Sequence, residues 1–340
     1  MSVPKLLVIG GNGFLGSAIC KSAVTKGWQV SSMSSSGKPY TTPAGHSPSW
    51  VSGVTWHSGS AFDPSSYTSL VGQSTAVVHT LGILLEDTGY KESVRNGDII
   101  GLTKSLFSTI GASGSGSGNP LKSEKERQRG YEGMNKDSAL KVLDTFLSTS
   151  TSTPTPNPKP TISTNPFSFN RKPSSDTMNQ SRQFVYISAA DAFRPVVPSR
   201  YIETKREAEL EIARKCQEDG GAKVKPIFMR PGLMYHPHIR PLTTLPAFLI
   251  DMSSKLSTAS GIANPFASKS PLHGMMESLR TYPLHVDHVA SAVLRCIEEA
   301  REPSGEEHDS WGGARVVEVP EMRDWAGLGK NKDKIQVGHL

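Results

Sequence analysis

The sequence has little cysteine and no long apolar run. Only three of its 340 residues are cysteine, and Cys20, Cys216 and Cys296 stand far apart. An odd, scattered set argues against a disulfide framework or a zinc cluster and favours buried thiols in a reducing compartment. Because no run of about 18 apolar residues occurs, we expect no transmembrane helix. No secretory signal is visible, and the first predicted strand begins so near Met1 that no cleavable presequence is expected.

Apolar residues are also scarce overall, at 36% of the chain. Two segments rich in small and polar residues, 111–130 and 148–182, account for much of the deficit. They cannot bury enough apolar surface to offset the entropy of ordering, so we expect flexible insertions. Long loops close at little extra entropic cost, so we predict one domain over residues 1–300 around both insertions. Residues 301–340 are expected to add an edge strand and a polar tail.

Concentrated positive charge is absent as well. The net charge is +6 at pH 7, but Lys and Arg are scattered and no basic patch with interleaved aromatic residues occurs. We therefore expect no nucleic-acid partner. A mild basic balance is compatible with a mitochondrial matrix protein or with an anionic membrane surface.

What the sequence does contain is a glycine-rich turn close to its start. An apolar run over residues 6–9 leads into Gly10-Gly11-Asn12-Gly13-Phe14-Leu15-Gly16, where a helical pattern begins. Gly10 permits a tight turn, Gly13 lets a pyrophosphate approach the main chain, and Gly16 lets the helix lie close to the strand. The N–H groups and the dipole of the first helical turn favour phosphate there. The segment predicts a dinucleotide site, the alternative being a strand–helix turn without a ligand.

Alternating strands and helices follow this turn. Further strands are predicted at residues 28–33, 54–59, 76–82, 184–188 and 227–229, and helices at 134–147 and 201–216. This alternation is typical of an α/β fold with a doubly wound parallel sheet of the Rossmann type.

A small C-terminal substrate region is expected from the substrate-side segments within residues 233–282. Residues 242–256 have helical spacing and are interpreted as a lid or core helix, or else as a surface for a prenylated compound or a membrane. A short strand is predicted over residues 282–286, with Asp287 as the N-cap of a helix that runs through Ile297. Residues 315–319 are expected to form a last edge strand.

A second set of polar residues follows the predicted strand 184–188. Ser188 lies at its carboxyl end, where ligands bind in a parallel sheet. Tyr201 and Lys205 are four residues apart on a predicted helix, so they project from the same face. An ammonium beside a phenol lowers the phenol pKa, and such a tyrosine can exchange a proton with a substrate oxygen while hydride moves to or from a nicotinamide. Without the glycine turn, a solvated Tyr and Lys on a surface helix would be an equal alternative.

These motifs, in this order, resemble the short-chain dehydrogenase/reductase superfamily in its extended or atypical branch. The matching strings are the turn 10–16, Asp63, His79-Thr80-Leu81-Gly82, Ser188, Tyr201 with Lys205, Arg230-Pro231-Gly232 and His285-Val286-Asp287-His288-Val289-Ala290. The resemblance implies that the first turn and the loops of Thr80 and Arg230 line a nicotinamide dinucleotide. It also implies that Ser188, Tyr201 and Lys205 are catalytic. For Arg230, a structural salt bridge is an equal alternative.

Within this superfamily the chain is similar to the fungal mitochondrial members associated with the coenzyme Q biosynthetic complex, and more distantly to the dinucleotide-binding accessory subunits of respiratory complex I. The strings that carry the closer similarity include residues 78–86, 119–122, 134–136 and 201–209. It implies a place on the matrix side of the inner membrane, with the proteins of that complex as partners. A small quinone or prenyl substrate and peripheral membrane contact are also implied. Three roles stay open: an oxidoreductase, a non-catalytic nucleotide-binding scaffold or regulator, and a sugar-nucleotide epimerase.

The residues after the second predicted strand bear on the choice of cofactor. NAD-binding members of this fold carry an acid there to hold the ribose hydroxyls. Residues 31–38 contain no acid, and Ser34, Ser36 and Lys38 can bind a 2′-phosphate. NADP(H) is therefore favoured, with NAD(H) as the alternative. Asp63 is interpreted either as an adenine contact or as the cap of the helix that Pro64 begins.

Overall fold

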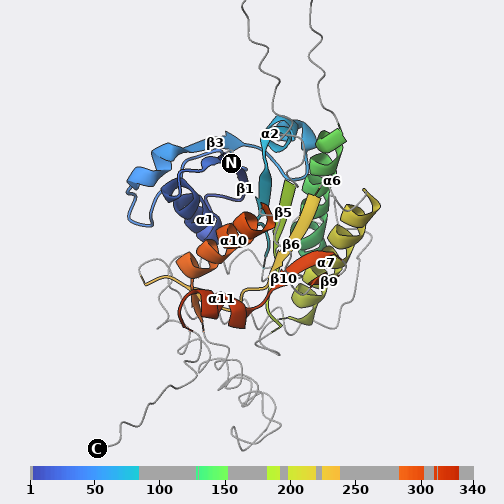
Figure 1. The fold of residues 1–340 in the computed structure, drawn as a ribbon. Helices are drawn as coiled ribbons and strands as arrows, with labels where there is room; N and C mark the ends of the chain where they lie inside the picture. The colour runs from blue at the N-terminus through green and yellow to red at the C-terminus, as the bar shows by residue number, and fades with distance from the viewer. Residues whose placement is uncertain are drawn as a thin grey trace, which may run out of the picture.

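The computed structural model describes residues 3–83, 128, 130–151, 182–191, 198–219, 224–237, 283–301, 310–311 and 313–328. In this part of the chain the central sheet has eight strands in the order β3-β2-β1-β4-β5-β6-β10-β9 (Figure 1). Their bounds are β1 Lys5–Ile9, β2 Gln29–Ser34, β3 Val54–Ser58, β4 Ala76–His79, β5 Arg182–Ile187, β6 Val224–Met229, β9 Ser310–Trp311 and β10 Ala314–Val317. All neighbouring strands are parallel except β9, which runs antiparallel to β10.

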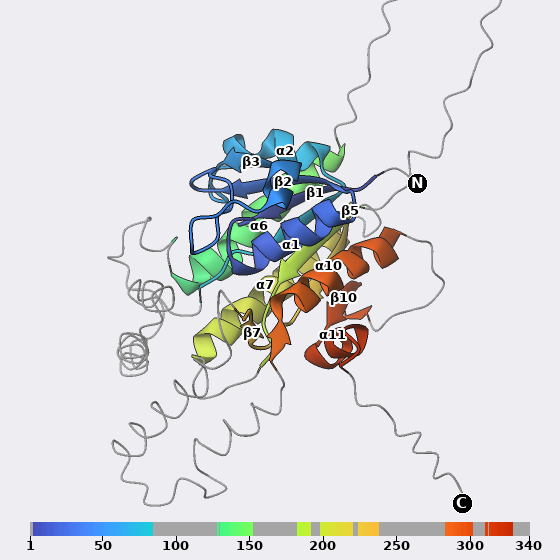
Figure 2. The same ribbon diagram turned by 90° about the vertical axis from the view of Figure 1, so that its left-hand side faces the viewer.

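Helices cover both faces of this sheet, as Figures 1 and 2 show. One face carries α1 (Phe14–Thr25) beside α10 (Val286–Arg301), and α11 (Val319–Trp325) packs against α10. The other face carries α2 (Thr68–Gln73), α6 (Ser138–Thr151) and α7 (Ser199–Glu218). Short helical turns are η1 (Ser49–Gly53), η2 (Pro64–Ser66) and the π-helical η3 (Glu132–Asp137), which leads directly into α6. A separate parallel pair joins β7 (Met234–Tyr235) to β8 (Leu284–His285).

The two helical layers are explained by the side-chain alternation of the strands. In β1, Leu6 and Val8 point into the core beneath α1 and α10, whereas Leu7 and Ile9 point toward α6 and α7. All four are buried, as expected for a parallel strand covered on both faces. The predicted doubly wound α/β fold is confirmed.

The strand order places the candidate site. The chain builds β2 and β3 on one side of β1, then crosses over to build β4, β5 and β6 on the other side. At such a reversal the loops after the two central strands diverge and leave a crevice at the carboxyl ends of the strands. Here these loops are the glycine turn after β1 and residues Thr80–Ile83 after β4.

Several predicted boundaries need correction. The strand expected at 315–319 is β10, but β9 lies outside it, so β10 is not the edge. Helix α6 runs to Thr151 and β5 begins at Arg182, so both ends of the insertion predicted over 148–182 are ordered. Arg182 explains one end, because its guanidinium donates to the carbonyl oxygens of Val71, Ser74 and Phe146 and so ties β5 to the ends of α2 and α6.

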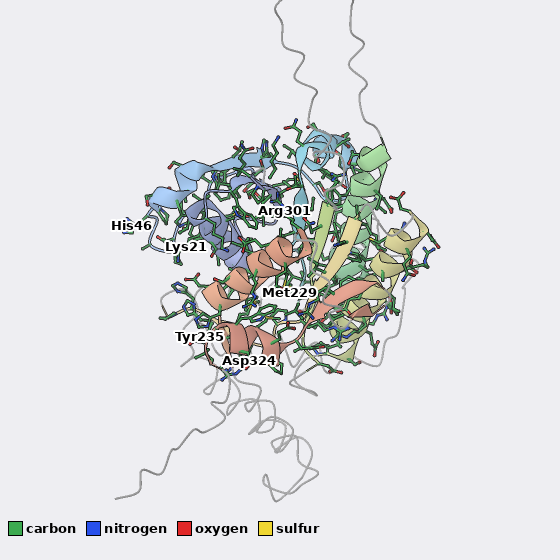
Figure 3. All side chains as sticks on the ribbon, in the orientation of Figure 1. Lys21, His46, Met229, Tyr235, Arg301 and Asp324 are labelled. Carbon is green, nitrogen blue, oxygen red and sulfur yellow. The ribbon has the colours of Figure 1, made fainter. Side chains whose placement is uncertain are left out.

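Asp287 is not the N-cap of α10, which begins one residue earlier at Val286. The imidazole Nδ1 of His285 accepts from the Asp287 N–H at 3.2 Å and thereby takes the role expected of the carboxylate. The Asp287 carboxylate instead pairs with Lys21 of α1 at 3.0 Å. Figure 3 labels Lys21, which lies on α1. The predicted helix at 242–256, most of the insertion at 111–130 and the polar tail lie outside the described residues.

Candidate active site at the carboxyl edge of the sheet

Three glycines of the turn after β1, Gly10, Gly11 and Gly16, have no room for a side chain. A Cβ at Gly10, whose φ is +90°, would lie 2.6 Å from Oγ1 of Thr80, and one at Gly11 would lie 2.3 Å from Oγ of Ser32. A Cβ at Gly16 would lie 2.2 Å from the carbonyl oxygen of Gly10, so the first turn of α1 rests directly on the loop. The backbone of α1 therefore approaches the end of β1 as closely as a phosphate-binding turn requires.

The start of α1 is left available to an anion. Within the described residues no side chain caps the helix and its first turn carries no acid, while Gly13 is the exposed N-cap residue. Helix dipoles attract negative charge at this end. The cradle that a Cβ would fill and the absence of a competing carboxylate both fit a dinucleotide pyrophosphate. Phe14 and Leu15, also predicted at this site, form the first turn of α1, and Leu15 is buried in the core.

The glycine turn is tied to the serine-rich loop after β2. Asn12 donates through Nδ2 to Oγ of Ser36 at 3.4 Å, and the N–H of Lys38 bonds to the same hydroxyl at 3.3 Å. Oγ of Ser34 accepts from the Gly37 N–H at 3.2 Å. Ser36 and Lys38 are exposed beside the turn, which is compatible with contact to a 2′-phosphate.

Asp63 caps the short turn η2. Its carboxylate accepts from the Ser65 N–H at 3.2 Å and from the Ser65 hydroxyl at 2.6 Å. Of the two interpretations given for this residue, the helix cap is the one that the structure contains. Contact with an adenine stays a prediction.

The loop after β4 links the glycine turn to Lys205. Thr80 donates to the carbonyl oxygen of Ile9 at 2.8 Å, and the side chain of Leu81 lies against Gly10. A Cβ at Gly82 would lie 2.9 Å from Nζ of Lys205 and 3.0 Å from Oδ1 of Asn135. The predicted cofactor loop and the predicted catalytic lysine therefore meet.

Lys205 carries a buried amine. Only 3% of the residue is exposed, and its Nζ donates to the carbonyl oxygen of Ile187 at 2.9 Å and lies 3.5 Å from that of Leu81. It also sits 4.7 Å from the ring centroid of Tyr186. Burial lowers the Lys205 pKa from 10.5 to about 7. An amine with this pKa changes charge readily near neutral pH.

His79 lies behind Lys205 and is fully buried. Its Nε2 is 3.1 Å from Oγ of Ser138, and its ring stacks on that of Tyr186. Burial, with the nearby charge of Lys205 as a further cause, lowers the His79 pKa to about 3. The imidazole therefore stays neutral at physiological pH and does not compete with the lysine for a proton.

Tyr201 lies one helical turn before Lys205 on α7, as predicted. The residue is half-buried, and its ring meets that of Tyr131 edge-on with 6.4 Å between centroids. Tyr201 and Lys205 thus share one face of α7, and their roles in catalysis stay predictions.

Asn135 is a site residue that sequence reasoning did not single out. It is buried in η3, where its Oδ1 accepts from the Ile83 N–H at 2.9 Å and its Nδ2 donates to Oγ1 of Thr204 at 3.3 Å. Its carbonyl oxygen accepts from the Tyr186 hydroxyl. A π-helical turn often marks a functional position. In the sequence, Asn135 is marked only by the string 134–136, which carries part of the family resemblance.

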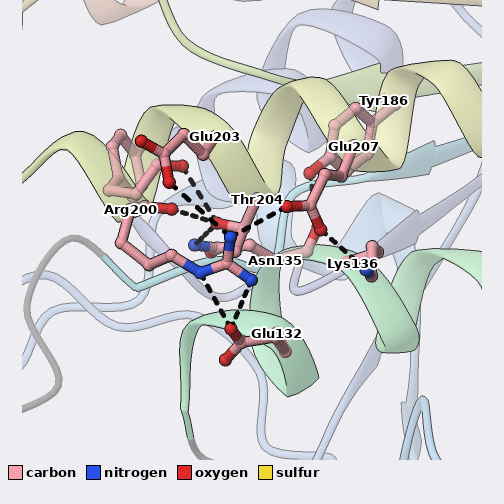
Figure 4. A network of polar contacts seen from close by, with 9 residues as sticks. Glu132, Asn135, Lys136, Tyr186, Arg200, Glu203, Thr204 and Glu207 are labelled. Carbon is pink, nitrogen blue, oxygen red and sulfur yellow. Dashed lines mark hydrogen bonds and ion pairs between the residues drawn. The ribbon is translucent and has the colours of Figure 1, made fainter. Parts of the chain in front are cut away.

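A belt of charged side chains holds η3 against α7 (Figure 4). Arg200 donates to Glu132 at 2.6 Å and to Glu207 at 2.8 Å, and it lies 3.6 Å from Glu203. Lys136 adds a 2.7 Å pair with Glu207. The belt frames the buried Asn135–Thr204 contact on its outer side.

Ser188 follows β5 and is buried. Its Oγ accepts from Nη1 of Arg206 at 2.9 Å, and its N–H donates to the carbonyl oxygen of Met229. Arg206, a residue of α7, was not among the predicted site residues. In the sequence, the only indication of a role for Arg206 is that it directly follows Lys205.

Arg230 follows β6 and is held in an ion-pair network. Its guanidinium binds both carboxylate oxygens of Glu209, at 3.0 and 2.5 Å, and Glu318 at 2.8 Å. These partners raise the Arg230 pKa. Arg230 thus forms the structural salt bridge that was one of its two interpretations, and its contact with a cofactor stays a prediction. Pro231 accepts from the Ala190 N–H through its carbonyl oxygen, so the loop with Gly232 packs beside Ser188.

Three histidines gather near the parallel pair β7–β8. The ring centroids of His236 and His285 are 5.2 Å apart, and those of His285 and His288 are 5.7 Å apart. In the described part of the chain no group of three or more His, Cys, Asp or Glu residues could hold a metal ion. Among the same residues no helix has the length and apolar character to span a membrane. All three cysteines are buried and free, as predicted.

Comparison with known proteins agrees with this geometry. The model of the NAD dependent epimerase/dehydratase family matches residues 6–94, which include the glycine turn. MIOREX complex component 2 of Saccharomyces cerevisiae is 38% identical over 236 residues, 69% of this chain and 74% of the yeast protein. The chain belongs to the family of this yeast protein. An uncharacterised chloroplastic protein of Arabidopsis thaliana is 45% identical over 78 residues, 23% of this chain and 24% of that one.

Solved structures with similar folds include a short-chain dehydrogenase/reductase family oxidoreductase from Burkholderia thailandensis. It is 11% identical, covers 94% of each chain and has a TM-score of 0.49. The UDP-Glc/GlcNAc 4-epimerase of Campylobacter jejuni is 15% identical and covers 94% of this chain and 82% of that one, with a TM-score of 0.45. The match of the NAD dependent epimerase/dehydratase model over residues 6–94 agrees with the predicted resemblance to short-chain dehydrogenases/reductases. The description of the matched family model implies a nicotinamide dinucleotide as cofactor, and the glycine cradle fits this group.

Proposed function

We propose that the protein is a nicotinamide-dependent oxidoreductase that uses Ser188, Tyr201 and Lys205. The observation that carries the proposal is the meeting of Lys205, Gly82 and Asn135 at the carboxyl edge of the sheet, next to a turn shaped for pyrophosphate. Burial leaves the lysine with few protein acceptors, so the hydroxyls of a ribose are natural partners for its ammonium.

The chemistry divides between the cofactor and the chain. A bound nicotinamide supplies or takes up a hydride. Tyr201 gives a proton to the substrate oxygen when a carbonyl becomes an alcohol, and recovers it in the reverse direction. Ser188 holds that oxygen by a hydrogen bond, and Lys205 places positive charge beside the phenol, which favours its ionised form.

NADP(H) is the cofactor that we favour. No acid follows β2, and the exposed Lys38 and Ser36 flank the glycine turn through the Asn12 bond. A 2′-phosphate would gain a cation there and meet no carboxylate. The mass of the nucleotide that stays bound in native mass spectrometry of the purified protein tests this. NADP(H) is expected from the wild type and no nucleotide from Gly13→Val, whereas an NAD(H) mass would contradict the preference.

The substrate that we propose is a quinone-ring or isoprenoid intermediate of coenzyme Q synthesis, handled on the matrix side of the mitochondrial inner membrane. This rests on the family resemblance described above. The yeast relative is named as a component of a complex, and this supports protein partners, which we propose to be those of the coenzyme Q complex. Peripheral membrane contact belongs to the same proposal.

A scaffold without chemistry is the second candidate, and the relative's name as a complex component favours it. The two differ in which residues matter. If bound nucleotide only stabilises or regulates an assembly, Gly13→Val abolishes function while Tyr201→Phe with Lys205→Met leaves it intact. An oxidoreductase loses function in both variants.

A further inference from the structure

Two consecutive residues of α7 hold three consecutive residues at the carboxyl end of β5, which ends at Ile187. Lys205 donates to the carbonyl oxygen of Ile187 at 2.9 Å. Arg206 donates through Nη1 to Oγ of Ser188 at 2.9 Å and through Nη2 to the carbonyl oxygen of Ala189 at 2.8 Å. An arginine therefore stands directly against the hydroxyl that the site offers to a substrate.

The orientation of Arg206 is set by a buried carboxylate. Its Nη1 also donates to Oε1 of Glu209 at 2.8 Å, and the Glu209 side chain is fully buried. Glu209 already has Arg230 as a two-point partner. Because that pair alone satisfies the carboxylate, Arg206 is not needed to neutralise it. Glu209 therefore holds the Arg206 guanidinium in place beside Ser188 and Ala189.

Hydrogen-bond chemistry shows how the contact with Arg206 affects the Ser188 hydroxyl. A guanidinium can only donate, so the Ser188 oxygen is the acceptor and the single hydroxyl proton must go to another oxygen. A hydroxyl that accepts a charge-assisted bond is also the stronger donor. We infer that Arg206 is a positioning residue that presents the Ser188 O–H to a substrate oxygen lacking a proton of its own, a ketone or quinone carbonyl.

This inference rests on the proposed function, because it takes Ser188 to face the substrate. It adds a substrate class. A carbonyl oxygen accepts the Ser188 proton, and a substrate hydroxyl in the reverse direction gives its own proton to Tyr201 while it still accepts from Ser188.

The test uses the full chain with NADPH and 9,10-phenanthrenequinone as the probe. The variants are Arg206→Met, Ser188→Ala and the pair together, with Arg214→Met as the control, because Arg214 is an exposed arginine of α7 paired with Glu211 and Glu218. Arg206→Met is expected to lower kcat roughly 10- to 100-fold with NADPH affinity unchanged. The double variant is expected to be no slower than Ser188→Ala, and Arg214→Met to match the wild type.

Two results would overturn the inference: a wild-type kcat for Arg206→Met, or losses that multiply in the double variant. If the wild type does not reduce the probe, a crystal structure of its NADP⁺ complex decides. A guanidinium on the Ser188 oxygen supports the inference, and one turned away from it overturns it. A protein that binds no nucleotide counts against the proposed function, since the Arg206–Ser188 contact needs no cofactor.

Discussion

Lys205 is the residue on which the account of the site depends. Burial of its ammonium group lowers the stability of the fold, so a functional reason for its position is expected. In the unfolded chain its pKa is near 10.5, and in the fold it falls to about 7. Between these values the unfolded chain binds a proton that the folded chain lacks. The free energy of unfolding therefore rises with pH across this window, and the full penalty is present below pH 7.

Lys205→Met is accordingly expected to stabilise the protein near neutral pH. A shift of this size corresponds to at most about 5 kcal/mol, and the Ile187 carbonyl left without a donor offsets about 1–3 kcal/mol of it. A gain of roughly 2 kcal/mol at pH 7 that shrinks and then reverses as the pH approaches 10.5 is expected in urea unfolding, because the unpaired Ile187 carbonyl remains when the burial penalty is gone. A variant that is less stable than the wild type at pH 7 would contradict the burial argument.

Gly16 tests the phosphate-binding turn at the same scale. A Cβ there would lie 2.2 Å from the Gly10 carbonyl oxygen and 2.8 Å from Cα of Gly11, both backbone atoms that cannot rotate away. Gly16→Ala is expected to destabilise the fold by roughly 1–3 kcal/mol and to abolish NADPH binding.

Gly72→Ala is the matched control for this change. Gly72 lies within α2, and a Cβ there would make only ordinary contacts, at 3.7 Å from Thr149. Alanine is favoured over glycine in a helix by roughly 0.5–1 kcal/mol. Calorimetric titration with NADPH should show normal binding for Gly72→Ala. Normal binding by Gly16→Ala would mean that the turn is not the pyrophosphate site.

At the scale of elements, the junction between η3 and α7 positions the site. Arg200 joins Glu132 of η3 to Glu207 of α7, and Lys136 meets Glu207 from the other side. Single surface ion pairs contribute little, but several that share one arginine act together. Arg200→Met is expected to lower stability by roughly 1–2 kcal/mol and to speed amide hydrogen exchange in η3.

Arg214→Met provides the comparison within the same helix. Arg214 pairs only with neighbours within α7 in the contacts described above, so its loss should leave the free energy of unfolding nearly unchanged. Equal effects of the two substitutions would show that the belt does not hold η3 in place.

The elements also show where sequence reasoning succeeds. Strands β1 and β4 and the second half of β5 are apolar runs followed by glycine or polar residues, and the periodicity of α7 is local, so these elements could be predicted. The π-helical turn could not, because Asn135 is held by Ile83 and Thr204, which are 52 and 69 residues away in the chain. The cap of α10 was missed because His285 took the place expected of Asp287.

At the scale of the whole molecule, the topology unites the two motifs. The glycine turn and the Tyr201–Lys205 helix are separated by some 185 residues of chain. The parallel order of β1, β4 and β5 places the glycine turn, the loop after β4 and Lys205 at the same carboxyl edge of the sheet. From the sequence, the proximity of the two motifs could be predicted only because their order along the chain resembles that of a known family. The Arg206–Ser188 contact and the Glu209–Arg230 pair depend on how α7 packs across β5 and β6, which no local pattern encodes.

The central claim is that this edge carries out redox chemistry rather than merely holding a nucleotide. The most direct measurement is the coenzyme Q content of cells that lack their own copy of this protein and express Tyr201→Phe, with native mass spectrometry confirming bound nucleotide. The account predicts that coenzyme Q stays at the level of the deletion, while the wild-type chain restores it. Full restoration by Tyr201→Phe would contradict the claim.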